Sequence, residues 1–179
     1  MSGTALLVVD MLNDYDHDDG DVLAENVAGM LGPLVDLVNR ARRHDDVDLV
    51  YVNDNHGDFA ADFTAIAAAA RGGRHPELVE PVLPRDGEMT LTKVRHSVFF
   101  STALDYLLRR LGTRTVVLTG QATEQCILYS ALDCYVRHFD VVVPPDAVAH
   151  IDPALGDAAL TLMERNMRAR LLTAEHCVP

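Results

Sequence analysis

The chain has no tryptophan and only three cysteines, which is an odd number. Disulfide frameworks use cysteines in pairs and are typical of small secreted proteins, so the sequence does not predict one. A chain of 179 residues, 49% of them hydrophobic, is long enough to bury a full core without disulfides or metal ions. We therefore expect one globular domain over residues 1–179.

Positive charge and long apolar runs are also scarce. Lys and Arg number 15 against 27 Asp and Glu, which gives a formal net charge of −12. Binding to phosphate groups requires clustered Lys and Arg, so this balance argues against a nucleic-acid or anionic-membrane partner. No apolar run approaches the length of a membrane span, and "MSGTALLVVD" lacks the features of a signal peptide. We expect a cytoplasmic protein that binds neither nucleic acid nor membrane.

The acidic residues are concentrated in one place, the run "DYDHDDGD" at residues 14–21. Several oxygen ligands close together are typical of a calcium loop. The run lacks the glycine and the closing glutamate that such a loop needs at fixed positions. We therefore interpret it as a solvated acidic loop.

Four short runs rich in Val and Leu predict strands, and they show no neat alternation of apolar and polar residues. Continuous apolar runs are typical of strands buried on both faces, as in a parallel sheet covered by helices. The four are "ALLVVD" (5–10), "VDLVYVN" (47–53), "TVVLTG" (115–120) and "DVVVPP" (140–145), and "MTLTKV" (89–94) and "RARLLT" (168–173) are weaker candidates.

Segments of helical period lie between these runs, at residues 27–41, 101–111, 123–138 and 153–168. In the first of them, Pro33 is tolerable only near the first turn or at a kink. Strands that alternate with helices predict an α/β layered fold with a mostly parallel sheet.

Polar side chains follow several predicted strands. In open parallel sheets the ligand crevice lies outside the carboxyl ends of the strands. The residues expected there are Asp10, Asn53 with Asp54, Lys93, and the segment 120–126. One carboxylate, one amine and one thiol therefore reach the same edge of the sheet.

The thiol belongs to Cys126 in "TGQATEQC", which we interpret as a tight connection into a helix with Thr123 as its N-cap. Free amides and the helix dipole at a helix start favour an anion, so they lower a thiol pKa from its usual value of about 8.5. The same amides can donate to an oxyanion. Lys93 would further stabilise the thiolate, and Asp10 could accept its proton. The alternative is that Cys126 is a small buried hydrophobic residue.

These residues carry a resemblance. "LLVVDMLNDY", "LTKVRHSVFFSTALDYLL" and "VVLTGQATEQCILYSALDCYVRHFDVVVPPDAV" resemble the isochorismatase-like cysteine hydrolases, which include nicotinamidases and N-carbamoyl amide hydrolases. The resemblance implies a three-layer α/β/α, Rossmann-like fold with a six-stranded, mainly parallel sheet. It also implies a catalytic triad of Asp10, Lys93 and Cys126, a small-molecule substrate and a homo-oligomer. We expect no cofactor.

The resemblance further implies a mechanism. The thiolate attacks an amide carbonyl, ammonia or an amine leaves, and water hydrolyses the thioester. Asp10 would be the general base, and Lys93 would lower the thiol pKa. A cis peptide bond between Gln121 and Ala122 would aim the amides of Ala122 and Cys126 at the oxyanion.

Two departures from the family pattern affect the pocket. Leu12 and Tyr15 stand where the family often has glutamine and phenylalanine. Tyr15 can still line an apolar pocket while it offers a hydroxyl group. Isochorismatases that act on a vinyl ether need no nucleophile, so the presence of Cys126 favours C–N bond hydrolysis.

A metal site is the main alternative within the family. Asp54 and His56 resemble the first two metal ligands of nicotinamidases, with His75 as a third, and such residues suit zinc or manganese. "YVNDNHGDF" also resembles a metal-free branch of the family, in which Asn53, Asp54 and Phe59 line the pocket. We expect the metal-free arrangement.

Three further reactive residues are assigned structural positions. If the strand that carries Lys93 continues, His96 points to the opposite face of the sheet. Cys134 lies about two turns after Cys126 on the same helix and is expected in the core. Nothing near Cys177 forms a site.

Two classes of function remain, a cysteine amidohydrolase and a non-catalytic small-molecule binder that keeps the fold. The three triad residue types favour the enzyme. Loops at residues 12–24, 54–75 and 144–153 are expected to line the pocket, and their sequences name no substrate.

Overall fold

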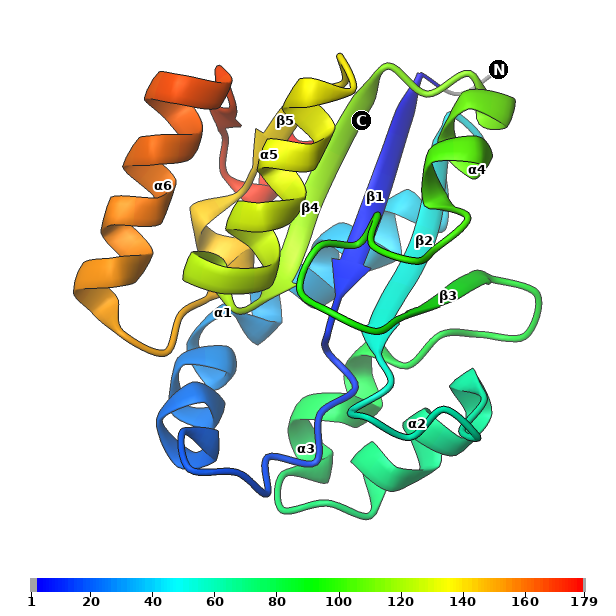
Figure 1. The fold of residues 1–179 in the computed structure, drawn as a ribbon, viewed down its shortest axis with the longest axis vertical. Helices are drawn as coiled ribbons and strands as arrows, with labels where there is room; N and C mark the ends of the chain where they lie inside the picture. The colour runs from blue at the N-terminus through cyan, green and yellow to red at the C-terminus, as the bar shows by residue number, and fades with distance from the viewer. Residues whose placement is uncertain (1–2, 179) are drawn as a thin grey trace.

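A computed structural model of the chain describes residues 3–178 (Figure 1). Its strands are β1 (Thr4–Val9), β2 (Val47–Asp54), β3 (Met89–Lys93), β4 (Thr115–Gln121), β5 (Asp140–Val143), β6 (Val148–Ala149) and β7 (Arg170–Leu171). Its α-helices are α1 (Gly20–Ala41), α2 (Phe63–Arg71), α3 (Pro76–Val79), α4 (Leu104–Leu111), α5 (Leu128–Val136) and α6 (Pro153–Met167). A π-helical turn, η2, covers Thr123–Ile127, and 3₁₀ turns cover Glu80–Val82, Pro145–Ala147 and Ala174–His176.

The strands form one sheet in the order β3-β2-β1-β4-β5-β7, and β6 pairs with β4. Every pairing is parallel. The predicted α/β fold with a mainly parallel sheet is therefore confirmed, and the two weaker strand candidates are β3 and β7. The sheet has seven strands instead of the six expected. The added strand, β6, has two residues, too few to leave a pattern in the sequence.

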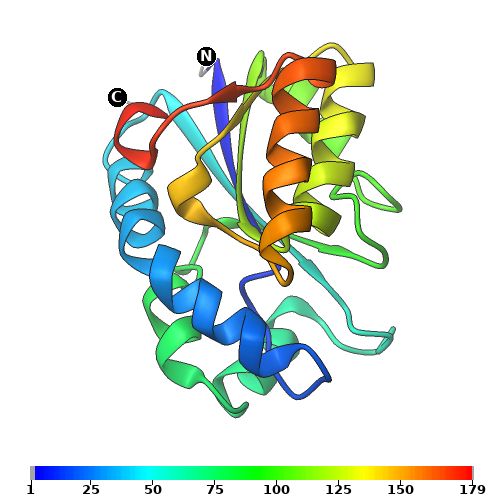
Figure 2. The same ribbon diagram turned by 90° about the vertical axis from the view of Figure 1, so that its left-hand side faces the viewer.

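Both faces of the sheet are buried, as the continuous apolar runs predicted. Successive side chains of a strand point to opposite faces. In β1, Leu6 and Val8 join the hydrophobic cluster under α1, whereas Ala5, Leu7 and Val9 join the cluster under α4, α5 and α6. Figure 2 shows the sheet between α1 on one side and α5 with α6 on the other. The molecule therefore has three layers.

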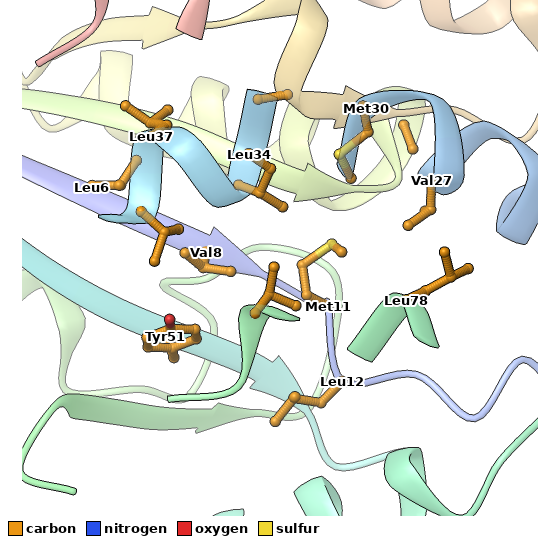
Figure 3. Packing of buried hydrophobic residues seen from close by; sticks show 14 of the residues in the cluster. Leu6, Val8, Met11, Leu12, Val27, Met30, Leu34, Leu37, Tyr51 and Leu78 are labelled. Atoms are coloured by element: carbon orange, nitrogen blue, oxygen red, sulfur yellow. The ribbon is translucent and has the colours of Figure 1, made fainter. Parts of the chain in front are cut away.

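Helix α1 begins earlier than the pattern predicted, at Gly20, so the end of the acidic run belongs to a helix. Leu34 and Leu37 of α1 lie over Leu6 and Val8 (Figure 3). Pro33 lies in the interior of the helix, where its ring nitrogen has no proton to donate to the preceding turn. Figure 2 shows the two halves of α1 inclined to each other, which is the effect expected of an interior proline.

The other predicted helices are confirmed with shifted ends. The predicted helix at 101–111 corresponds to α4, which begins only at Leu104. The predicted helix at 123–138 consists of the π-helical turn η2 followed by α5. Helices α2 and α3 were not predicted; α2 lies within the expected pocket loop 54–75, and α3 follows that loop directly. No helix within residues 3–178 is long and apolar enough to cross a membrane.

Strand β3 forms one edge of the sheet and pairs only with β2 along the sheet order. An ion pair fixes the chain just before it: the Arg42 Nε lies 2.7 Å from the Glu88 Oε1, and both side chains are largely buried. The same guanidinium donates to the Tyr51 hydroxyl of β2 at 3.0 Å. The end of α1, the neighbouring strand and the start of the edge strand are thus tied together.

Gly120 allows β1 and β4 to approach closely just before the strands end. It pairs with Val9 in the register of the two strands and has a φ of 106°. A Cβ atom at this position would lie 2.0 Å from the Val9 carbonyl oxygen, far inside contact distance. Only glycine fits here, because the conformation and the space both exclude a side chain.

We expect Gly120→Ala to destabilise the fold by about 2–5 kcal/mol, because it adds a backbone clash to an unfavourable φ. Chemical denaturation of purified protein measures the change. Gly29→Ala is the matched control, since no atom lies within 4 Å of its Cβ and the position is helical. The control should be neutral or stabilising by up to about 1 kcal/mol. Equal stability of the two variants would contradict the close-approach argument.

Candidate active site

The three side chains predicted as a triad meet at one edge of the sheet. In Figure 1 the arrowheads of β1 and β2 point toward this edge. The Lys93 Nζ lies 3.0 Å from the Asp10 Oδ2 and 3.7 Å from the Cys126 Sγ. Asp10 and Cys126 line a cavity of about 280 Å³. Residues 116 positions apart in the chain therefore share one site, as the strand-end argument predicted.

Lys93 is the last residue of β3, and the sheet register places it directly beside Asp54, the last residue of β2. Its side chain is 0% exposed and its Nζ also lies 3.1 Å from the Asp54 Oδ2. Burial by itself lowers the pKa of Lys93, but Asp10, Cys126 and Asp54 outweigh it and the pKa is raised. Lys93 is therefore a buried cation that stays charged at any physiological pH.

Asp10 follows β1 with a φ of 53°, a left-handed conformation that turns its side chain toward β2 and β3. Its Oδ1 accepts a hydrogen bond from the Asp54 amide at 2.8 Å, while its Oδ2 faces Lys93. The Asp10 carbonyl oxygen accepts a bond from the Gln121 side chain at 2.6 Å. The carboxylate is held from both sides, which fixes its direction relative to the thiol.

Cys126 lies within the π-helical turn η2, not in the first turn of an α-helix as predicted. Thr123 is inside this turn and makes no capping hydrogen bond, so the N-cap prediction is wrong. The Gln121–Ala122 peptide bond is cis, as the resemblance implied. The Ala122 carbonyl accepts the amides of Gln125 at 3.1 Å and Ile127 at 3.2 Å, and it does not bind the amide of Cys126 between them.

The predicted decrease in the thiol pKa is also wrong. Burial raises the pKa of Cys126, the negative charge of Asp10 and a hydrogen bond to it raise it further, and Lys93 offsets only part of this. The attraction of Lys93 for the thiolate lowers the pKa, but by less than burial and Asp10 raise it. In the resting protein Cys126 is therefore a neutral thiol beside a carboxylate that can accept its proton.

The three loops expected to line the pocket each contribute to the cavity, through Asp19, His56 and Ile151 respectively. Asn13 and His17, from the same loop as Asp19, were not singled out from the sequence. The signal available was their place directly after the strand that ends at Asp10. That position predicts a location but no specific role.

His96 also lines the cavity, and its predicted position on the opposite face of the sheet is wrong. The prediction assumed that the strand continues, but β3 ends at Lys93 and the chain turns, with a φ of 30° at His96. The His96 Nδ1 lies 3.9 Å from the Cys126 Sγ. Ser97, the next residue, is anchored to Asp133 of α5, so the turn is held against the helix that follows Cys126.

Three residues predicted to line the pocket do not contribute to this cavity. Tyr15 is fully buried, with its ring edge-on to His75 at 5.5 Å between centroids. The Asn53 side chain bonds the amide and the carbonyl of Leu12 at 2.9 and 3.1 Å, so it supports the pocket loop from behind. The side chain of Phe59 is 82% exposed. Asp54 does line the cavity.

The residues of the alternative metal site do not fit a metal ion. The Asp54 carboxylate binds Lys93 through one oxygen and the amide of His56 through the other. The His75 Nδ1 lies 3.0 Å from the Glu77 Oε1 and its ring packs on Tyr15. Within residues 3–178, no group of three or more His, Cys, Asp or Glu side chains is arranged to hold a metal.

Comparison with known proteins identifies the family. Residues 4–176 match the family model described as the isochorismatase domain. The chain belongs to the isochorismatase family. It is 32% identical over 174 residues to YaaI, an uncharacterized isochorismatase family protein of Bacillus subtilis, and the match covers 97% of this chain and 96% of YaaI.

Two characterised types of amidohydrolase are among the relatives. The chain is 30% identical over 188 residues to the ureidoacrylate amidohydrolase RutB of Methylorubrum extorquens, covering 90% of this chain and 76% of RutB. The structure of N-carbamoylsarcosine amidase from Thermoplasma acidophilum is similar with a TM-score of 0.75, at 30% identity over 98% of each chain. The protein is an isochorismatase-family hydrolase related to amidohydrolases.

We expect Asp10→Asn to increase the reactivity of Cys126 toward iodoacetamide. The change removes the carboxylate that raises the thiol pKa, so more thiolate is present at a given pH. Lys93→Met should have the opposite effect. Alkylation rates of the Cys126 peptide, measured by mass spectrometry from pH 6 to 10, give the profiles. Glu164→Gln, which removes an exposed carboxylate on α6, is the control and should match the wild type. An Asp10→Asn profile displaced to higher pH would contradict the assignment.

We also expect the activity to be independent of metal, because Asp54, His56 and His75 are not arranged to bind a metal ion. Prolonged treatment with a chelator should leave the hydrolytic rate unchanged, and elemental analysis of purified protein should find no stoichiometric zinc or manganese. About one equivalent of metal, lost together with activity in His56→Ala, would contradict this.

Proposed function

We propose that the protein hydrolyses a C–N bond of a small amide, carbamoyl compound or lactam through a thioester on Cys126. The observation that carries the proposal is the contact of one buried ammonium group with both the Asp10 carboxylate and the Cys126 sulfur, at the wall of a cavity of about 280 Å³. A neutral thiol next to a fixed carboxylate, with a fixed cation beside both, suits proton transfer coupled to nucleophilic attack.

In the proposed first half-reaction, Asp10 accepts the proton of the Cys126 thiol as the sulfur attacks the carbonyl carbon. The carbonyl oxygen becomes an oxyanion. When the C–N bond breaks, the protonated Asp10 gives its proton to the departing nitrogen, and ammonia or an amine leaves. The acyl group remains on the sulfur as a thioester.

In the proposed second half-reaction, Asp10 accepts a proton from a water molecule that attacks the thioester carbonyl. The C–S bond breaks, the proton returns to the sulfur, and a carboxylic or carbamic acid leaves. Asp10 serves as base and then as acid in each half-reaction, so one carboxylate is sufficient for both.

The backbone amides of Ala122 and Cys126 are the proposed donors to the oxyanion. The Ala122 carbonyl oxygen accepts hydrogen bonds from the amides of Gln125 and Ile127, and it does not bind the amide of Cys126 between them. This supports the Cys126 amide as a donor to the oxyanion. Donors fixed by the backbone need no reorganisation when the negative charge develops.

Lys93 has an electrostatic role in this proposal. Lys93, Asp10, Asp54 and Cys126 together carry a net charge of −1 when the thiol is neutral, and moving the thiol proton to Asp10 leaves that net charge unchanged. Loss of the thiol proton to solvent would instead make the net charge −2, which is unfavourable in a buried site. Burial and the excess negative charge therefore favour transfer within the site over loss of the proton to water, and Lys93 stabilises the thiolate that the transfer forms.

We expect Cys126→Ala to abolish turnover and to preserve the fold, because it removes only a small side chain. Asp10→Asn should lower the rate by about 10²–10⁴. Ammonia or amine release from a panel of nicotinamide, carbamoylated amines and lactams measures turnover, circular dichroism checks the fold, and intact mass detects the acyl adduct on Cys126. Full activity of folded Cys126→Ala would contradict the proposal. Binding of panel compounds by a wild-type protein that turns over none of them would support a non-catalytic binder.

A further inference from the structure

The cavity beside Cys126 is lined by three carboxylates, those of Asp10, Asp19 and Asp54. No lysine or arginine among residues 3–178 lines it. The remaining polar side chains of the lining are amides, imidazoles and the thiol itself. A substrate that enters therefore meets negative charge without an accessible cation to offset it.

Lys93 does not supply that cation. Its side chain has no exposed surface, and its ammonium group is bound to Asp10 at 3.0 Å and to Asp54 at 3.1 Å. An anionic substrate group could reach it only by displacing one of these carboxylates. Since both are held by backbone amides as well, that displacement is unfavourable.

Two arginines close to the segments that form the pocket, Arg74 and Arg95, do not line it either. The Arg74 Nη2 lies 2.6 Å from the Asp21 carboxylate, and its Nη1 faces the Tyr15 carbonyl. Arg95 lines a neighbouring cavity that shares only His96 with the catalytic one.

Asp19 is the carboxylate best placed to contact a substrate. It immediately precedes α1 but makes no capping hydrogen bond, and its side chain has no partner within the described chain. It is exposed at the mouth of the cavity, whereas Asp10 and Asp54 are engaged with Lys93. An unpaired carboxylate on a pocket wall favours a cationic ligand group and opposes an anionic one.

We propose that this site selects neutral or positively charged small amides and discriminates against anionic ones, with Asp19 contacting the charged end of a cationic substrate. The assignment names the substrate class of the proposed hydrolase and rests on that proposed function. The charge preference of the cavity can nevertheless be measured without any turnover.

The first experiment uses Cys126 itself as the probe. Two thiol reagents of the same reactive group, 2-aminoethyl and 2-sulfonatoethyl methanethiosulfonate, carry opposite charges. Their rates with Cys126 at pH 8 are followed by peptide mass and divided by their rates with 2-mercaptoethanol. We expect the normalised cation-to-anion ratio to be on the order of tenfold or more.

Asp19→Asn should lower that ratio by roughly two- to fivefold, the usual size for an exposed charge pair. Asp18→Asn is the matched control: it removes the same charge from the adjacent exposed residue, which does not line the cavity, and should leave the ratio nearly unchanged. A normalised ratio of one or below in the wild type, or equal ratios in the two variants, would overturn the proposal.

The second experiment measures turnover with three amides that differ only in their terminal group: β-alaninamide, butyramide and succinamate. We expect kcat/KM for ammonia release to follow the order cationic or neutral above anionic, and the disadvantage of succinamate to shrink as salt is raised. Preference for succinamate would overturn the charge assignment. If none of the three releases ammonia while the reagent ratio still favours the cation, the proposed activity toward such amides fails and the charge assignment stands.

Discussion

One buried ammonium group holds the site together. Lys93 has no exposed surface, yet it contacts the carboxylates of Asp10 and Asp54 and the sulfur of Cys126. Removing one partner of a buried ion pair leaves an uncompensated charge and typically costs about 3–5 kcal/mol. The carboxyl ends of β1, β2 and β3 and the turn after β4 are thus fixed relative to one another by the same charges that the proposed chemistry uses.

A neutral resting thiol changes how such a site should be understood. Reactive cysteines are commonly explained by a lowered pKa, but here burial and Asp10 raise the pKa of Cys126. Oxidation and alkylation depend on thiolate, so a raised pKa slows both. In the proposed mechanism the nucleophile forms only when a substrate carbonyl is present, because its negative charge then passes to an oxyanion bound by the backbone amides. In the proposed mechanism, selectivity toward substrate follows from this coupling.

The sequence predicted the parts of this protein that depend on regular geometry. Continuous Val and Leu runs predicted the buried strands, and the rule that ligands bind beyond strand ends placed Asp10, Lys93 and Cys126 together. The errors arose where the chain leaves regular structure. His96 was assigned to the wrong side because β3 stops at Lys93, and the π-helical turn around Cys126 leaves no pattern. The direction in which the Cys126 pKa shifts depends on how several charged groups are arranged around the buried sulfur. That arrangement is known only from the structure.

The edge position of β3 has a consequence for the order in which the protein loses structure. This five-residue strand is tied by Arg42 and Glu88 at its start and by the ion pairs of Lys93 at its end. Edge elements open before central ones when a fold loosens. Detachment of β3 would withdraw the cation from the site while β1, β4 and the thiol stay in place. We therefore expect the proposed activity to be lost before global unfolding, because the attachment of this edge strand decides how long the site remains assembled.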